Sequence, residues 1–199
     1  MKLQDYKVLI LVVTAISALI VASPALQRLL VYPQTDFFTE LSLLGPGHTA
    51  EDFPYNITSG VSYNVFLNVT NQLGQCAYYQ VQVKFRNQNQ SAPDSTNLTP
   101  STLTPLYTIN AVVANQETWE LPITFSFDYS YDGNSSQINF NHLMLNNAAL
   151  NLSGSSTSWD SQENVFFGNL VFELWIYNET TSSFQYHQRA VDLKFNMLP

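Results

Sequence analysis

An unbroken apolar run near the beginning of the chain is its most pronounced pattern. Residues 8–26 read VLILVVTAISALIVASPAL and are flanked by Lys2, Lys7 and Arg28. A helix of this length extends about 28 Å, close to the hydrocarbon thickness of a bilayer. The pattern therefore predicts a transmembrane anchor at residues 1–28, with the lipid bilayer as partner of residues 8–26.

A secretory signal peptide has a similar order of charged and apolar residues. Its cleavage would follow a small residue such as Ala22 or Ser23, but Pro24 comes directly after Ser23 and the apolar character continues to Leu26. These features favour an uncleaved anchor. The lysines on its amino-terminal side predict a cytoplasmic N-terminus, a single pass through the cell membrane and an extracellular remainder.

Beyond the anchor, apolar and polar residues alternate with a period of two, as in strands that bury one face. The pattern is clearest at residues 61–70, 79–86 and 121–128. The residues expected to face inward there are Val61, Tyr63, Val65, Leu67 and Val69; Tyr79, Val81, Val83 and Phe85; and Leu121, Ile123, Phe125 and Phe127. Further strands are expected at residues 37–44, 106–113, 138–145, 166–177 and 184–197.

Two of these segments depart from simple alternation. Residues 166–177 are apolar at both parities, which is typical of a central strand. In the last segment, Phe184 and Tyr186 have the opposite parity from Val191 and the apolar residues after it. This change of parity predicts a bulge or break between the two halves of that strand.

Short strands, without heptads or a long amphipathic helix, predict an all-β fold. We expect an antiparallel, immunoglobulin-like β-sandwich that forms one extracellular domain at residues 29–199, preceded by the single N-terminal transmembrane helix. Residues 87–105 are polar and rich in proline, so we expect a long exposed loop there. Residues 151–160 are expected to form a second loop, with a helical turn near Trp159.

The net charge of the chain beyond the anchor excludes one class of partner. Residues 29–199 contain fourteen carboxylates and only four cations, a formal charge of −10. The cations are Lys84, Arg86, Arg189 and Lys194. Because such a field repels phosphate backbones, we expect no nucleic-acid binding.

Cys76 is the only cysteine, so an intramolecular disulfide is impossible and the domain must be stabilised by burial. A buried free thiol is the simplest interpretation of Cys76. An intermolecular disulfide is the alternative.

Asn-x-Ser/Thr sequences occur about twice as often as chance predicts for this composition. They begin at Asn56, Asn68, Asn89, Asn97, Asn134, Asn151 and Asn178. Four of these positions fall in expected loops, one ends a strand and one lies on a polar strand face. N-linked glycans are therefore predicted, although Pro100 soon after the Asn97 sequence makes that site the least secure; ordinary turn roles are the alternative.

Residues that carry catalysis are not apparent in the sequence. His48, His142 and His187 do not have metal-ligand spacing, and no metal or other cofactor is expected. The carboxylates of Glu51 and Asp52, and of Asp128 with Asp132, fit turn or surface roles. Nucleotide-binding and hydrolase motifs are missing from the sequence, so the chain is expected not to be an enzyme.

Three short segments, FTEL at residues 38–41, LGP at 44–46 and AEDFP at 50–54, resemble an archaeal membrane-anchored family known only as a domain of unknown function, numbered sixteen-sixteen. The similarity continues through AYYQVQVKFRNQNQSAPDS, TWELPITFSF and VFELWIYN. It implies an integral membrane protein without an established activity, so no catalytic residue is carried over. Members of that family often have several spans, whereas one is expected here.

These observations favour a non-catalytic, N-glycosylated ectodomain that acts as an accessory or scaffold subunit of a membrane or cell-envelope complex. The oligosaccharyltransferase is a specific candidate, because its acceptor side faces the same compartment. A structural subunit of an envelope filament or surface layer is the main alternative, since sandwich domains pair through strand edges. An enzyme or small-ligand binder would need a polar pocket that the sequence does not reveal.

Overall fold

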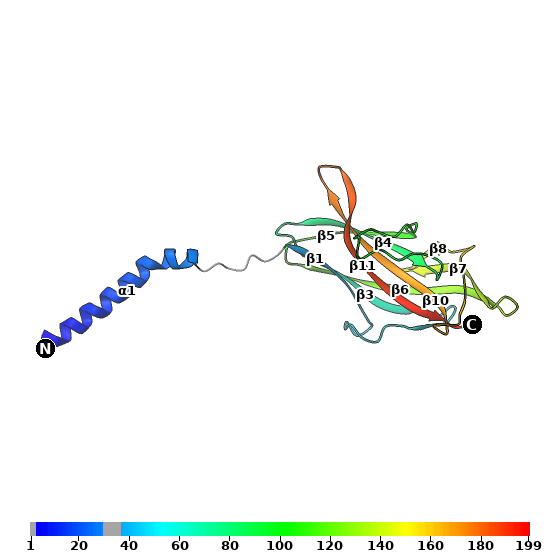
Figure 1. The fold of residues 1–199 in the computed structure, drawn as a ribbon, viewed down its shortest axis with the longest axis horizontal. Helices are drawn as coiled ribbons and strands as arrows, with labels where there is room; N and C mark the ends of the chain where they lie inside the picture. The colour runs from blue at the N-terminus through cyan, green and yellow to red at the C-terminus, as the bar shows by residue number, and fades with distance from the viewer. Residues whose placement is uncertain (1–2, 30–36) are drawn as a thin grey trace. The chain divides into compact units, whose positions relative to one another are not determined.

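The chain divides into two units in the computed structural model, which describes residues 3–29 and 37–199. Helix α1 (Leu3–Leu29) forms the first unit, and every described strand belongs to the second (Figure 1). Lys2, one of the charges used above to orient the anchor, lies outside the described residues. The domain boundary expected at residue 28 falls at the end of α1.

Helix α1 is long enough and apolar enough between Tyr6 and Ser23 to cross a membrane. Two hydroxyl side chains in the middle of the helix bond back to it: Thr14 Oγ1 donates to the Ile10 carbonyl at 2.6 Å, and Ser17 Oγ donates to the Val13 carbonyl at 2.8 Å. Hydrocarbon offers no other hydrogen-bond acceptor, so this arrangement suits burial in lipid. The helix suggests a single-pass membrane anchor.

The second unit is all-β, as predicted. Its described strands are β1 (Phe38–Leu44), β2 (Asn56–Ile57), β3 (Tyr63–Gln72), β4 (Ala77–Arg86), β5 (Tyr107–Val113), β6 (Thr118–Asp132), β7 (Gln137–Leu145), β8 (Ala148–Asn151), β9 (Ser156–Asp160), β10 (Val165–Asn178) and β11 (Ser183–Met197). Each strand segment expected from the alternation corresponds to one of them. Val61 is the exception at residue level, because it precedes β3 and is exposed.

Two sheets are joined through one short strand (Figure 1). The first sheet has the order β1–β3–β6–β7, with β8 on β7; the second has the order β5–β4–β10–β11–β2. Strand β9 pairs with both β7 and β10 and so connects the two sheets. All pairings are antiparallel except β11 with β2. The immunoglobulin-like arrangement of strands is not confirmed.

Aromatic rings from both sheets meet in the core. The Phe195 ring of the second sheet lies 5.3 Å from Phe127 and 6.3 Å from Phe125 of the first, measured between ring centroids. Phe85 and Phe127 make a similar contact at 5.6 Å. Gly168 allows this packing, because an added Cβ would clash with the Phe195 ring. The residues predicted to face inward on β4 and β6 therefore do form the core.

The parity change in the last strand is a bulge, as predicted. Leu174 of β10 pairs with Arg189, but the next residue, Trp175, pairs with Tyr186. His187 and Gln188 are thus extra residues on β11, and Gln188 adopts a left-handed φ of 57°. Tyr186, opposite Trp175, therefore lies on the outer face of the sheet, whereas Val191, opposite Phe172, packs against the core.

The two loop predictions had different outcomes. Residues 87–105 form no strand, as expected, although the single bridge between Asp94 and Thr99 orders part of them. The prediction for residues 151–160 was wrong, because Ser156–Asp160 is strand β9 and Trp159 lies in it. Serine-rich composition hid this strand, which exists because β7 and β10 both offer it a hydrogen-bonding edge.

Candidate functional site

Polar residues follow matched rows on the outer face of the second sheet, the face turned away from the core. Residues paired across an antiparallel sheet point to the same side, so each row forms one line of neighbouring side chains. Three consecutive rows across β4, β10 and β11 are Arg86–Asn169–Lys194, Lys84–Val171–Asp192 and Gln82–Glu173–Ala190. Three of the domain's four cations therefore lie in two adjacent rows.

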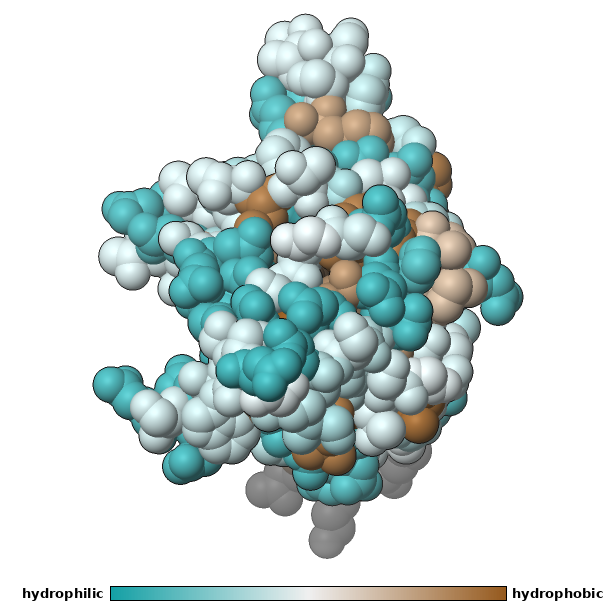
Figure 2. Space-filling view, turned by 90° about the vertical axis from the view of Figure 1, so that its right-hand side faces the viewer, coloured by the Kyte–Doolittle hydropathy of each residue, from teal (hydrophilic) through white to brown (hydrophobic). Residues whose placement is uncertain are grey.

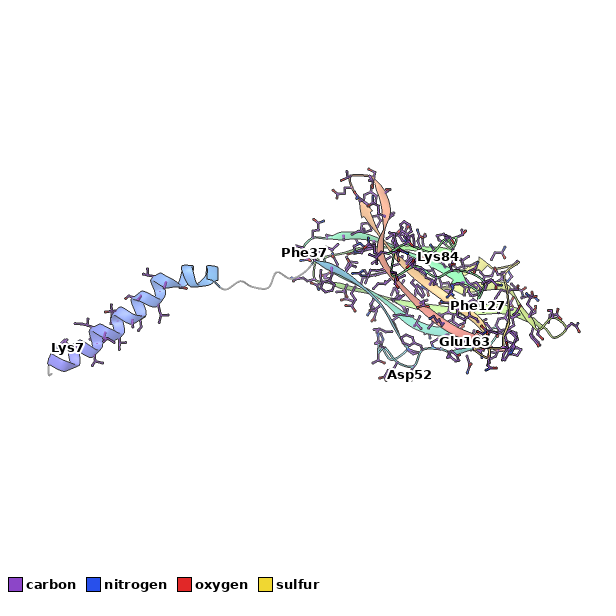
Figure 3. All side chains as sticks on the ribbon, viewed as in Figure 1. Lys7, Phe37, Asp52, Lys84, Phe127 and Glu163 are labelled. Carbon is purple, nitrogen blue, oxygen red and sulfur yellow. The ribbon has the colours of Figure 1, made fainter. Side chains whose placement is uncertain are left out.

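A buried ion pair occupies this face. Lys84 Nζ lies 2.7 Å from Glu173 Oε2, and the two side chains are only 3% and 0% exposed. Figure 3 labels Lys84 on β4, on the body of the domain. The alternation had placed Lys84 on a solvated polar face, and this expectation was wrong. Charges are rarely buried to this degree unless they are paired and hydrogen-bonded.

Ser101, from the long polar loop, completes the arrangement. Its backbone N–H donates to Glu173 Oε1 at 2.8 Å, and its hydroxyl donates to the same oxygen at 2.5 Å. Lys84 Nζ donates to the Ser101 carbonyl and hydroxyl oxygens, both at 3.3 Å. We call Lys84, Ser101 and Glu173 the latch, because together they fasten residues 87–105 to the second sheet.

The bonding of the latch indicates a structural role. A nucleophilic serine needs a base that takes its proton and an open approach for the substrate. Ser101 is only 8% exposed, and its hydroxyl already contacts both Lys84 and Glu173. Both carboxylate oxygens of Glu173 accept hydrogen bonds as well. The loop predicted to be exposed is therefore buried where it crosses the ion pair.

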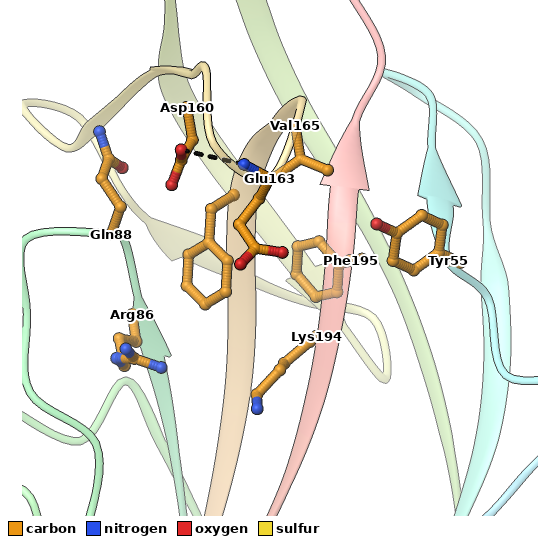
Figure 4. A pocket seen from close by; sticks show the side chains of 9 residues that line it. Tyr55, Arg86, Gln88, Asp160, Glu163, Val165, Lys194 and Phe195 are labelled. Carbon is orange, nitrogen blue, oxygen red and sulfur yellow. Dashed lines mark hydrogen bonds between the residues drawn. The ribbon is translucent and has the colours of Figure 1, made fainter.

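Beside the latch, the same face is hollowed. One hollow of about 570 Å³ lies between loop residues 92–98 and β11. A second, of about 420 Å³, is lined by Glu163 and Phe167 among others (Figure 4). Arg86 and Lys194 line both hollows. We call the two hollows together the groove.

The cations of the groove are only partly engaged. Arg86 donates from Nε to the Gln90 carbonyl at 2.7 Å, and its guanidinium carbon lies 5.1 Å from the centre of the Phe167 ring. Lys194 is 64% exposed, and its Nζ is 3.8 Å from Asp192 Oδ2. Such an exposed pair contributes little to stability, so the ammonium group remains accessible.

Asn169 lies between these two cations and is fully buried. Its Nδ2 donates to Asp192 Oδ2 at 2.9 Å. Its Oδ1 has no hydrogen-bond donor among the described residues. Sequence reasoning missed Asn169 and Glu173, although a signal existed: each interrupts the apolar run of β10, and both have the parity of its outer face.

A second buried polar network joins the first strand to the bulge. Thr39 Oγ1 lies 2.8 Å from both Tyr79 Oη and His187 Nε2, and Tyr79 Oη donates to Asn71 Oδ1 at 3.3 Å. Burial raises the pKa of Tyr79, and burial together with the nearby Arg189 lowers the pKa of His187. This network is uncharged and links strands of both sheets, which suits a structural role.

The sequons occupy accessible positions. Asn56, Asn89, Asn97, Asn134 and Asn151 are exposed, whereas Asn68 and Asn178 are half-buried. Asn151 is the last residue of β8 and not a loop residue, which corrects its predicted position. Asn97 Nδ2 donates to Asp94 Oδ2 at 2.6 Å, and hydrogen bonds from Asn97 and Thr96 lower the pKa of Asp94. Glycosylation itself stays a prediction.

The other polar residues singled out in the sequence are dispersed. His48 contacts Glu120 at 3.0 Å, and His142 contacts Asp128 at 3.5 Å, all at exposed positions. Asp132 accepts hydrogen bonds in the turn after β6, which lower its pKa. Within residues 3–29 and 37–199, no group of three His, Cys, Asp or Glu side chains is placed to hold a metal ion.

Cys76 is exposed, so the interpretation as a buried thiol was wrong. It lies immediately before β4, in the connection from β3, where the chain has not yet entered the core. Alternation begins at Ala77, which is buried. Figure 2 shows one face of the molecule coloured by hydropathy, on which brown apolar residues form only small separate patches.

Comparison with protein families gives one match. The model of DUF1616, described as a domain of unknown function, matches residues 33–158, which confirms the family resemblance. The archaeal source implied by that resemblance stays a prediction. None of the curated proteins matches the chain.

Solved structures show only a distant similarity. A β-glucosidase from Listeria innocua in complex with glucose has 9% identity and a TM-score of 0.38, covering 83% of this chain and 17% of its own. The CARDB domain of the PF1109 protein from Pyrococcus furiosus, in complex with di-metal ions, has 8% identity, a TM-score of 0.38 and coverages of 82% and 90%. Spo0M, a sporulation control protein from Bacillus subtilis, has 9% identity and a TM-score of 0.38, covering 81% of this chain and 49% of its own.

Proposed function

The chain belongs to the DUF1616 family, a domain of unknown function, and on that premise we propose that it is a non-catalytic, membrane-anchored accessory or scaffold subunit of a membrane or cell-envelope complex. In this proposal α1 spans the cell membrane with its N-terminus in the cytoplasm. The all-β unit lies outside the cell and carries N-linked glycans. Its role is to hold or position other membrane or envelope proteins.

The state of the latch is the observation that carries this proposal. In the described part of the chain, Lys84, Ser101 and Glu173 form the most deeply buried charged cluster, and their hydrogen bonds are directed at one another. These hydrogen bonds hold the loop in place and are not available to a substrate. A rigid domain with a secured loop layer and an apolar helix suits a scaffold better than a catalyst.

Within this class, the oligosaccharyltransferase remains our specific candidate partner. The enzyme acts on Asn-x-Ser/Thr sequences on the outer side of the membrane, where this domain is proposed to lie. Only the proposed topology supports this choice.

Purification of the full chain from its native membrane in mild detergent tests the proposal. We expect the chain to migrate as a complex in stoichiometric amount with other membrane proteins, which mass spectrometry of the complex identifies. Recovery of the oligosaccharyltransferase catalytic subunit would support the specific candidate. Migration of the chain alone, at its own mass plus detergent, would overturn the subunit role.

The mature N-terminus separates the accessory subunit from the filament subunit. Mass spectrometry is expected to find residues 1–28 intact, since an anchor is retained. A chain that begins after the apolar run and assembles into filaments would contradict the proposal and support the alternative.

Glycan occupancy tests the proposed orientation. We expect glycans on exposed turns, with Asn134 occupied more fully than Asn97, whose amide nitrogen already bonds to Asp94. An Asn134→Gln variant should lose the mass of one glycan, whereas Asn146→Gln, at an asparagine outside any sequon, should lose none. An unmodified chain from a host that glycosylates other proteins would contradict an extracellular domain.

A further inference from the structure

The groove on the second sheet gathers charge that the rest of the domain lacks. Its larger hollow is lined by Arg86, Arg189 and Lys194, which are three of the four cations in residues 29–199. The fourth, Lys84, is sealed in the latch. A domain with a formal charge of −10 thus places every exposed cation around one cavity. The groove is therefore the place on the domain where an anionic group would meet the most cations.

Free hydrogen-bond donors are available on these cations. Among the described residues, Arg86 uses Nε for the Gln90 carbonyl, while its two terminal nitrogens have no acceptor. Arg189 uses Nε and Nη1 for backbone carbonyls. Lys194 has only the distant contact with Asp192. Because Arg86 and Lys194 stand on either side of Asn169, a single carboxylate between them can accept bonds from both.

Acceptors surround the same cations. Asp94 and Asp192 line the larger hollow, and Asp160 and Glu163 line the smaller one (Figure 4). A ligand for this groove must therefore offer donors to several acceptors as well as negative charge to the cations.

A carboxylated sugar has this combination of groups. Its carboxylate can pair with Arg86 and Lys194, and its hydroxyls can donate to the carboxylates that line the two hollows. Tyr186 lines the larger hollow and offers an aromatic ring to the apolar face of a sugar. Hollows of about 420 and 570 Å³ lie in the range of small-molecule sites.

We propose that the groove binds an acidic carbohydrate, with its carboxylate held by Arg86 and Lys194 and its hydroxyls donated to the carboxylates that line the two hollows. Inorganic phosphate suits the groove less well, because it brings only one or two hydroxyl donors, whereas a sugar acid brings several for the carboxylates of the two hollows. Neutral sugars bring the donors but leave the cations unpaired. The groove thus selects for both features in one molecule.

Calorimetric titration of the full chain in detergent tests this assignment. The probes are digalacturonate, the uncharged digalactose of the same linkage, and inorganic phosphate. Digalacturonate is expected to bind at least about tenfold more tightly than either of the others, because only it pairs the cations and satisfies the acceptors. Equal binding of phosphate would reduce the groove to a general anion site and overturn the proposal, as would no binding of digalacturonate at millimolar concentration.

Variants at exposed positions locate the binding. Lys194→Gln should weaken digalacturonate binding about five- to tenfold, and Lys194→Arg should restore most of it, because the charge is kept at a side chain that is 64% exposed. Glu163→Gln should strengthen binding, because one repelling carboxylate is removed. Thermal unfolding of each variant verifies that the fold is retained. Unchanged affinity in Lys194→Gln would place any binding elsewhere and overturn the proposal.

Discussion

The outer faces of the two sheets both come from strands in which apolar and polar residues alternate, but the surroundings of the two faces differ. On the first sheet, outward-facing polar residues meet solvent; Thr124 Oγ1, for example, donates to Asn64 Oδ1 at 2.7 Å at the surface. On the second sheet, Lys84, Asn169 and Glu173 face outward but are at most 3% exposed. The outer face of the first sheet is exposed to water, whereas the latch on the outer face of the second sheet is covered by the loop at residues 87–105.

This difference determines how much the hydrogen bonds of a polar residue contribute to stability on each face. On the first sheet, water supplies the alternative hydrogen bonds, so each contact contributes little net free energy. On the second sheet no water competes, and each buried group depends on its protein partner. The loop thus adds a layer over the outer face of the second sheet. Mutations at equivalent outward positions of the two sheets should therefore change the free energy of unfolding by unequal amounts.

Removal of one latch charge should have the largest effect. Glu173→Gln leaves the Lys84 ammonium buried without its counter-charge, so the free energy of unfolding should fall by about 3 to 5 kcal/mol. Denaturant unfolding of the full chain in mild detergent, followed by tryptophan fluorescence, measures this. On the open face, Glu120→Gln is the matched control and should cost less than about 1 kcal/mol, because its pair with His48 is exposed.

The double variant Lys84→Met, Glu173→Leu distinguishes a buried charge from a packing defect. Two apolar residues of similar volume remove the unpaired charge but leave the Ser101 N–H without its acceptor, so this variant should recover part of the lost stability. If Glu173→Gln costs no more than Glu120→Gln, burial beneath the loop is not what distinguishes the two faces.

Loss of the Ser101 hydroxyl should have the next largest effect. Ser101→Ala removes the donor to Glu173 Oε1 but keeps the backbone donor, so we expect a loss of about 1 to 3 kcal/mol. Residues 87–105 should also be cut faster in limited proteolysis, since the loop is less firmly held. Ser95→Ala, at an exposed position of the same loop, is the control and should leave both measurements nearly unchanged.

The sequence predicts the alternation, but it does not predict what covers a face. The inward residues of β4 and β6, the central position of β10 and the bulge in β11 all follow from the parity of apolar residues. Parity depends only on local geometry, because successive side chains of a strand point to opposite sides. These features were therefore accessible without a structure.

The candidate site depends on long-range contacts that parity does not encode. Ser101 and Glu173 are separated by 72 residues, and Lys84 and Glu173 by 89. A polar, proline-rich loop gives no sign that one of its serines will be buried. Strand β9 was missed for a related reason, since its existence depends on the edges of β7 and β10 and not on its own composition.

Buried polar groups also occur between the sheets, and His187 extends the comparison to that place. Its pKa is lowered by burial and by Arg189, so the folded state keeps His187 neutral at a pH where the unfolded chain, with a histidine pKa of about 6.5, binds a proton. Stability should therefore fall as the pH decreases below about 6.5. His187→Gln should flatten the dependence of stability on pH. Unfolding measurements between about pH 5 and pH 8, roughly the range in which histidine titrates, test this.

The control for His187 is an exposed histidine. His142 is 55% exposed beside Asp128, so His142→Gln should leave the slope of stability against pH in place. A slope that persists in His187→Gln but disappears in His142→Gln would show that surface charge, and not the buried network, sets the acid response.

The smallest effect is expected on the open face itself. Thr124→Val removes the hydroxyl that donates to Asn64, but water can replace the lost partner and valine favours an extended strand. We therefore expect a change of at most about 0.5 kcal/mol in the free energy of unfolding. Thr124 and Ser101 each lose one short bond that the hydroxyl donates, and Ser101 also loses the 3.3 Å bond accepted from Lys84 Nζ, so the pair compares an open position with a covered one. A cost for Thr124→Val as large as that for Ser101→Ala would mean that the bond, and not its shielding by the loop, determines stability.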